Sequence, residues 1–133
     1  MLMPKDEKWL ESISQIVREA GRLILNLQKK DYAVQEKGAA NYVTAIDLAV
    51  QSYILAELKQ RTPDFAVMAE ESDVNQTSFA RPTWILDPVD GTTNLMRDYR
   101  HSAISLALAE EGRVTLGIVF NPYSSELFLA TEQ

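Results

Sequence analysis

The sequence contains no cysteine and only one histidine, His101, among its 133 residues. Without cysteine the chain can form neither a disulfide nor a thiolate metal site. The sequence does not indicate an oxidising or a reducing compartment, because a protein without cysteine is compatible with both. Any metal ion would have to be held mainly by oxygen ligands, and such ligands favour Mg²⁺, Ca²⁺ or Mn²⁺.

Basic residues are also few, with 13 Lys and Arg against 19 Asp and Glu and a formal net charge of −6. No cluster of Lys or Arg marks a surface for a phosphate backbone, so we expect no nucleic-acid partner. No apolar run approaches the roughly 18 residues that cross a bilayer, and the N-terminus lacks the apolar core of a signal peptide. We therefore expect a cytoplasmic protein without a membrane partner.

The chain is long enough for one domain with a buried core, and a second full domain would not fit. Hydrophobic residues make up 46% of it and charged residues 24%, which is close to the average of globular proteins. No internal repeat, low-complexity tract or Gly/Ser linker divides the sequence. The composition indicates an ordinary folded domain.

Two long helices are predicted from the spacing of apolar residues. Over residues 5–29 these residues recur at intervals of three and four, which predicts one buried helical stripe. A similar pattern begins near Thr44 and stops before Pro63, because proline disfavours a helical conformation at the residue before it. Between the two helices, Tyr32 and Val34 indicate a short extended segment that leads into a turn.

The rest of the chain reads as strands. Residues 65–72 and 83–90 are apolar runs that end in acids, residues 102–109 and 114–120 form a hairpin pattern, and residues 127–133 begin another strand. The fold class is therefore α+β, with two long helices packed on a mainly antiparallel sheet. Because a terminal strand edge is normally covered or paired, we expect either a truncated C-terminus or pairing with a partner subunit in a homodimer.

Carboxylates occur in three places where chemistry could use them. Asp47 lies in the first turn of the second helix, Glu70 and Glu71 follow one strand, and Asp87 and Asp90 follow another. Two carboxylates at about 4 Å repel each other by on the order of 4 kcal/mol at an effective dielectric constant near 20. A cluster of these acids would therefore take up protons or bind cations.

The stretch WILDPVDGTTN adds groups that suit a metal and a phosphate. In a regular strand Asp87 and Asp90 would point to opposite faces, so both can meet one ion only if the chain bends between them, which Pro88 favours. The bend would expose the carbonyl of Val89 as a neutral ligand. Gly91 allows close approach of the backbone, and the residues after it offer amides and hydroxyls at a helix start.

Structural explanations compete with each of these interpretations. Thr44 and Asp47 fit a helix capping box, and Glu70-Glu71 fits a solvated strand end. The segment DPVDGTT fits a turn, since Asp, Pro and Gly are turn formers. A single histidine such as His101 is more often a surface side chain than a ligand. Lys37 is more often a solvated loop residue, although it could also bind a phosphate. Three acid-bearing segments in one short chain favour a functional site.

The segments EKGAANYVTAID, VMAEES and WILDPVDGTTN occur in this order and spacing, and together they resemble the inositol monophosphatase family of Mg²⁺-dependent, lithium-sensitive sugar phosphatases. The resemblance implies that Glu70, Asp87 and the Val89 carbonyl hold one Mg²⁺, with Mn²⁺ as a substitute. It also implies that Asp87 and Asp90 hold a second ion, and that Asp47 orients the water of a third.

Further roles follow from the same resemblance. Thr92 would pair with Asp47 to activate the attacking water near Glu70, and the amides of Gly91 and Thr92 would hold the phosphate. Lys37 matches a family lysine near the active site, and Glu71 is a further candidate there. The expected reaction is hydrolysis of a small phosphorylated sugar or polyol by metal-activated water.

The sequence departs from the family pattern by lacking its second α/β layer, which carries a W-D-x-A-A motif. Residues 1–133 are therefore expected to be the N-terminal metal-binding domain alone, with low or no activity. Because related enzymes share this metal-binding motif, a 3'(2'),5'-bisphosphate nucleotidase activity and a fructose-1,6-bisphosphatase activity remain alternatives for this protein. A haloacid dehalogenase phosphatase is disfavoured, because its aspartates stand two apart rather than three. A non-catalytic assembly module is the alternative from another class.

Overall fold

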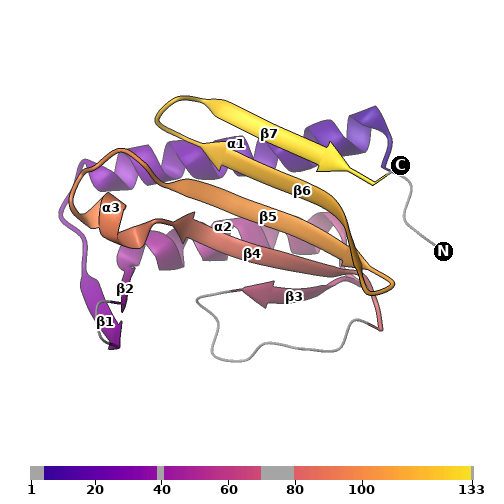
Figure 1. The fold of residues 1–133 in the computed structure, drawn as a ribbon, viewed down its shortest axis with the longest axis horizontal. Coiled ribbons are helices and arrows are strands. Elements are labelled where there is room, and N and C mark those ends of the chain that lie inside the picture. Colours follow the sequence, from indigo (N-terminus) through magenta and orange to yellow (C-terminus); the bar gives the residue numbers. More distant parts are fainter. Residues whose placement is uncertain (1–4, 39–40, 70–79, 133) are drawn as a thin grey trace.

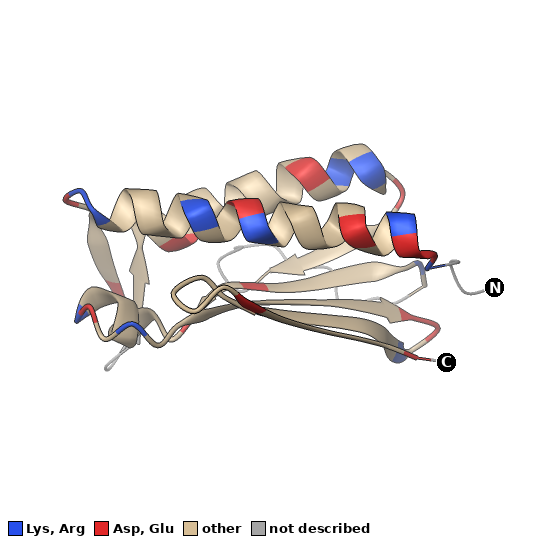
Figure 2. Cartoon of the chain, turned by 90° about the horizontal axis from the view of Figure 1, so that it is seen from above, with Lys and Arg blue, Asp and Glu red and all other residues tan. Residues whose placement is uncertain are grey.

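A computed structural model describes residues 5–38, 41–69 and 80–132 (Figure 1). Helices α1 (Glu7–Gln28) and α2 (Ala45–Arg61) run side by side along one face of a five-stranded sheet. Figure 2 shows the two layers from the edge, with the helices above the strands. In the described part of the chain, no helix covers the opposite face of the sheet. The α+β class with two long helices on a sheet is confirmed.

The sheet has the strand order β3-β4-β5-β6-β7. Its first two strands, β3 and β4, run parallel, and the remaining neighbours pair antiparallel. The sheet is therefore mainly antiparallel, as the sequence predicts. The strands are β3 (Ala66–Ala69), β4 (Thr83–Asp90), β5 (Ala103–Glu110), β6 (Arg113–Asn121) and β7 (Glu126–Thr131).

Both long helices begin at side-chain caps. The Asp6 carboxylate accepts a hydrogen bond of 2.8 Å from the backbone N–H of Trp9 at the start of α1. Thr44 caps α2, which ends at Arg61, two residues before Pro63. The apolar stripe of α1 is buried as predicted, and its most buried members are Ile13, Ile16, Val17, Ala20 and Ile24.

A two-stranded antiparallel sheet joins the helices, formed by β1 (Val34–Gly38) and β2 (Asn41–Thr44). The sequence predicts only the first of these as an extended segment. The four residues of β2 are too few to show a strand alternation, and its pairing with β1 comes from tertiary packing. The predicted strand over residues 65–72 is β3 as far as Ala69, and its remaining residues lie outside those described.

Trp84 holds β4 in place at the centre of the core. Its side chain is fully buried, and its ring stacks on that of Trp9 with ring centroids 6.1 Å apart. The indole N–H donates a hydrogen bond of 2.9 Å to the hydroxyl of Thr62, just past the end of α2. Both long helices are thus tied to β4 near its start, and the acids lie at its other end.

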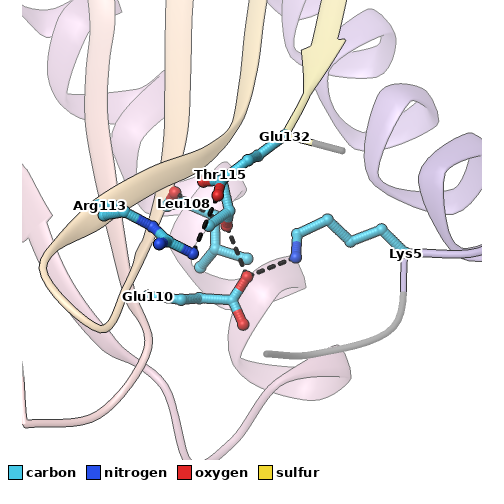
Figure 3. A network of polar contacts seen from close by, with 6 residues as sticks. All are labelled: Lys5, Leu108, Glu110, Arg113, Thr115 and Glu132. Atoms are coloured by element: carbon cyan, nitrogen blue, oxygen red, sulfur yellow. Dashed lines mark hydrogen bonds and ion pairs between the residues drawn. The ribbon is translucent and has the colours of Figure 1, made fainter. Parts of the chain in front are cut away.

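A buried ion pair fastens the end of the sheet that lies away from the acids of β4 (Figure 3). Lys5 Nζ lies 2.5 Å from Oε1 of Glu110, whose side chain is only 2% exposed. The hydroxyl of Thr115 donates a 2.5 Å hydrogen bond to the same oxygen. At the same turn, Arg113 pairs with Glu132 at 2.9 Å. These contacts attach the segment before α1, and the residue after β7, to the β5–β6 hairpin.

Among the described residues, no helix is both long and apolar enough to cross a membrane.

Candidate active site

Asp47 joins the start of α2 to the loop after β4. Its side chain is fully buried, and Oδ1 accepts a hydrogen bond of 2.7 Å from the backbone N–H of Thr44 and another from the Thr44 hydroxyl. Oδ2 accepts a hydrogen bond of 2.8 Å from the hydroxyl of Thr92. Thr44 and Asp47 therefore form a capping box at the start of α2, and the same carboxylate also binds Thr92, which follows β4 and Gly91.

The end of β4 carries a bulge that turns its two aspartates the same way. Asp87 pairs with Ser105 of β5, and Asp90 pairs with Ala103. Three steps along β4 therefore match two steps along β5, which is the signature of one extra residue. Because Ser105 and Ala103 lie on one face of their strand, their partners share that face. The bend that the spacing predicts is present, and Pro88 lies within it, where proline is tolerated.

Gly91 adopts a backbone conformation that favours glycine, with φ of +98°. A Cβ atom there would lie 3.1 Å from the carbonyl oxygen of His101 and 3.3 Å from Oγ of Ser102. The Ser102 hydroxyl donates a 2.8 Å hydrogen bond to the Gly91 carbonyl. The short helix α3 (Thr92–Met96) begins at the next residue, as the sequence predicts.

Asn94 and Ser102 support this loop, and neither was predicted as a site residue. The Asn94 side-chain amide donates a 2.8 Å hydrogen bond to the carbonyl oxygen of His101. His101 therefore contributes its backbone, while its side chain is exposed. The asparagine stands in the DGTTN string and could have been marked from it, but nothing in the sequence around Ser102 signals its role.

A recess opens between β4, the loop after it and β2. It is lined by Tyr42, Asp87, Val89, Asp90, Gly91, Thr92, Thr93 and Asn94. Tyr42 is a wall residue that the sequence did not predict. Most of the predicted residues of this region, namely the two aspartates, the Val89 backbone and the phosphate loop, are thus brought together by the fold.

The oxygen donors of the recess suit a hard divalent cation. Asp87 and Asp90 supply carboxylates, and Oδ1 of Asp87 is shielded from solvent. The Thr92 hydroxyl has one proton, and it lies closer to Asp47 (2.8 Å) than to the carbonyl oxygen of Val89 (3.2 Å). The hydroxyl therefore donates mainly to Asp47, and the Val89 carbonyl keeps lone pairs for an ion.

Not every predicted site residue enters this arrangement. Glu70 and Glu71 lie outside the described residues. Within the residues that are described, no three His, Cys, Asp or Glu side chains gather as a metal centre. Lys37 is an exposed residue of β1, and it is not part of the recess lining as far as the structure describes it. Its predicted place near the active site stays a prediction.

The fold and site define an α+β domain that presents carboxylate and carbonyl oxygens at one end of its sheet, beside a glycine-containing loop. The family model for the inositol monophosphatase family matches residues 5–133. This chain belongs to that family. The resemblance seen in the three sequence segments is confirmed.

Three known proteins that are similar to this chain are each about twice as long as it. An inositol-1-monophosphatase of Synechocystis is 40% identical over 129 residues, which cover 96% of this chain and 45% of the relative. The structure of an IMPase from Thermotoga maritima matches with a TM-score of 0.85 and 34% identity, covering 96% of this chain and 49% of that one. The chain thus spans about half the length of the relatives it matches.

A third similar structure is an IMPase/NADP phosphatase complexed with NADP and Ca²⁺. It matches with a TM-score of 0.86 and 25% identity, covering 97% of this chain and 50% of that one. A divalent cation is therefore present in at least one similar solved structure.

Proposed function

We propose that this chain is the metal- and phosphate-binding part of a divalent-metal-dependent phosphomonoesterase, which hydrolyses a sugar or inositol monophosphate by metal-activated water. The observation that carries the proposal is the hydrogen bond from Thr92 to Asp47. It joins two segments that are 45 residues apart, and it places a hydroxyl–carboxylate pair at the start of α3, two residues after Asp90.

The donor set supports a site for Mg²⁺, with Mn²⁺ as a substitute. Asp87, Asp90 and the Val89 carbonyl would hold the ions, together with Glu70. Bound there, the metal would make water a better nucleophile near neutral pH and would offset the charge of the phosphoryl group. The bulge supports this proposal, because it places two carboxylates on one face of the strand, where a cation would offset their repulsion.

The residues of the chain would prepare the attacking water and the phosphate. The Thr92 proton is directed to Asp47, so the Thr92 oxygen can accept a hydrogen bond from a water molecule. Thr44 holds the other Asp47 oxygen and fixes the carboxylate at the start of α2. The backbone amides of Gly91 and Thr92 would bind the phosphate oxygens.

The test combines metal binding with phosphate release from inositol 1-phosphate. We expect the 133-residue chain to bind Mg²⁺ and Mn²⁺ weakly in calorimetric titrations and to release little or no phosphate. Asp87→Asn should weaken Mn²⁺ binding by more than about tenfold. Asp98→Asn is the matched control, because the Asp98 side chain is 72% exposed. Equal Mn²⁺ binding by wild type and Asp87→Asn would overturn the metal site.

The same titrations separate the alternatives. A folded chain that binds no metal would favour the non-catalytic assembly module, and rapid turnover by the 133 residues alone would contradict low activity of the fragment. A substrate panel on the longer protein, with bisphosphorylated nucleotides and fructose 1,6-bisphosphate, would distinguish the related hydrolases.

We further propose that residues 1–133 are the N-terminal domain of this enzyme and that it acts in the cytoplasm. The edge strand β7 carries Phe128, which is 61% exposed, so a second copy could pair there. Light scattering across a range of protein concentrations tests the homodimer.

A further inference from the structure

The short helix α3 is bound near its end by side chains from the N-terminal part of the chain. The carbonyl oxygen of Leu95, near the end of α3, accepts a hydrogen bond of 3.1 Å from the side-chain amide of Gln28. The hydroxyl of Tyr32 lies 3.4 Å from the same oxygen. Gln28 is the last residue of α1, and 67 positions separate it from Leu95.

A second hydrogen bond sets the orientation of the Gln28 amide. The Tyr123 hydroxyl donates a 2.6 Å hydrogen bond to Oε1 of Gln28, which leaves Nε2 directed to Leu95. Tyr123 is itself held in the β6–β7 turn, where its backbone N–H donates a 2.9 Å hydrogen bond to the Asn121 side chain. Three parts of the chain are therefore linked in series, from Tyr123 through Gln28 to Leu95.

Helix α3 needs such support, because five residues do not form a stable helix alone. Its only buried residue is Leu95, whose side chain is 1% exposed. The Tyr32 contact is a weak addition, since a hydroxyl hydrogen bond is normally about 2.7 to 2.8 Å long. The amide of Gln28 is the main long-range anchor of the Leu95 carbonyl.

We propose that Gln28 and Tyr123 are positioning residues for the site. By fixing the end of α3 they hold its first residue, Thr92, in hydrogen-bonding register with Asp47, and they hold the adjoining amide of Gly91 beside the recess. This inference rests on the proposed function, because the phosphate-binding loop is what the series of hydrogen bonds would position. Neither Gln28 nor Tyr123 lines the recess or touches a reacting group.

The first test measures how firmly α3 is held. Hydrogen exchange is followed at the backbone N–H of Leu95, which donates to Gly91 within α3, and at amides of β5 and β6 as reference. Gln28→Leu should speed exchange at Leu95 about fivefold, the effect of losing one hydrogen bond, and leave the reference amides unchanged. Gln15→Leu is the matched control, since the Gln15 amide donates to Glu19 on the exposed side of α1.

The second test measures the affinity for Mn²⁺ together with inorganic phosphate by calorimetry. Gln28→Leu should lower it about fivefold, by the same loss of one hydrogen bond. Gln28→Glu keeps the acceptor for Tyr123 but cannot donate to Leu95, so it should behave like Gln28→Leu. Tyr123→Phe should have a smaller effect, and adding it to Gln28→Leu should cost nothing more, because Tyr123 acts through Gln28.

The outcomes distinguish the inference from the proposed function. Unchanged exchange at Leu95 in Gln28→Leu would overturn the anchoring of α3. Faster exchange with unchanged affinity, or full function in Gln28→Glu, would show a role in structure alone and overturn positioning. If the unsubstituted chain binds neither Mn²⁺ nor phosphate, the proposed function fails, and the positioning role falls with it.

Discussion

Removing one partner of the buried ion pair between Lys5 and Glu110 should strongly lower the free energy of unfolding. The Lys5 side chain is 10% exposed and that of Glu110 is 2% exposed. Lys5→Met would remove the cation that lies 2.5 Å from this buried carboxylate and would keep the hydrogen bond from the Thr115 hydroxyl. Removal of one member of a buried pair costs about 3 to 5 kcal/mol, and we expect the lower end because that hydroxyl remains. In thermal unfolding this corresponds to roughly 10 °C.

Urea unfolding followed by tryptophan fluorescence measures this change, since Trp84 is fully buried in the folded chain. Replacing both partners, with Lys5→Met and Glu110→Gln together, should recover much of the loss, because a neutral amide then takes the place of the buried carboxylate. Arg22→Met is the matched control. Its pair with Glu19 has side chains 62% and 41% exposed, and such pairs contribute less than about 1 kcal/mol. A loss below about 1 kcal/mol in Lys5→Met would refute the reasoning.

Three further predictions concern the site and its surroundings. Gly91→Ala should lower the free energy of unfolding by about 1 to 2 kcal/mol, because φ is +98° and the new Cβ would press on the His101 carbonyl; urea unfolding that matches wild type would contradict this. Asp47→Asn removes one of two buried acceptor oxygens, so the same assay should show a loss of about 1 to 3 kcal/mol, and calorimetry should show weaker metal binding. Burial raises the pKa of Tyr32 and of Tyr123 in the folded chain. The contribution of these two tyrosines to the free energy of unfolding should therefore be complete below a pH of about 10, where tyrosine titrates in the unfolded chain. It should be lost as the pH rises through the raised pKa values of the folded chain. Urea midpoints between pH 8 and 11 measure this fall, which should be smaller in Tyr123→Phe.

The elements with strong local signals could be predicted from the sequence. The apolar stripe over residues 5–29 corresponds to α1, and the T-x-x-D pattern at Thr44 corresponds to the cap of α2. The acids after the apolar run of β4 and the glycine before α3 were also predicted. These features depend on residues within four positions of one another, so they can be predicted from the spacing of residues in the sequence.

Other features could not be predicted because they depend on distant parts of the chain. The strand β2 forms only against β1, and β3 lies parallel to β4. The Ser102 contact with Gly91 has no pattern in the sequence, and Gln28 looks like any polar residue at the end of a helix. Asp87 and Asp90 were expected to converge on one ion, and only the pairing with β5 shows the extra residue that places both on one face of the strand.

The sequence by itself determined the two long helices, most of the strand segments, the chemical groups of the site and the family. The tertiary structure decided which of those groups meet. The Thr92 hydroxyl reaches Asp47, and Gln28 reaches Leu95, only because burial of the core packs α1 and α2 on one face of the sheet and brings an end of each helix to the segment after β4. Local propensity is encoded by near neighbours, whereas these contacts join residues 45 and 67 positions apart through the packing of the core.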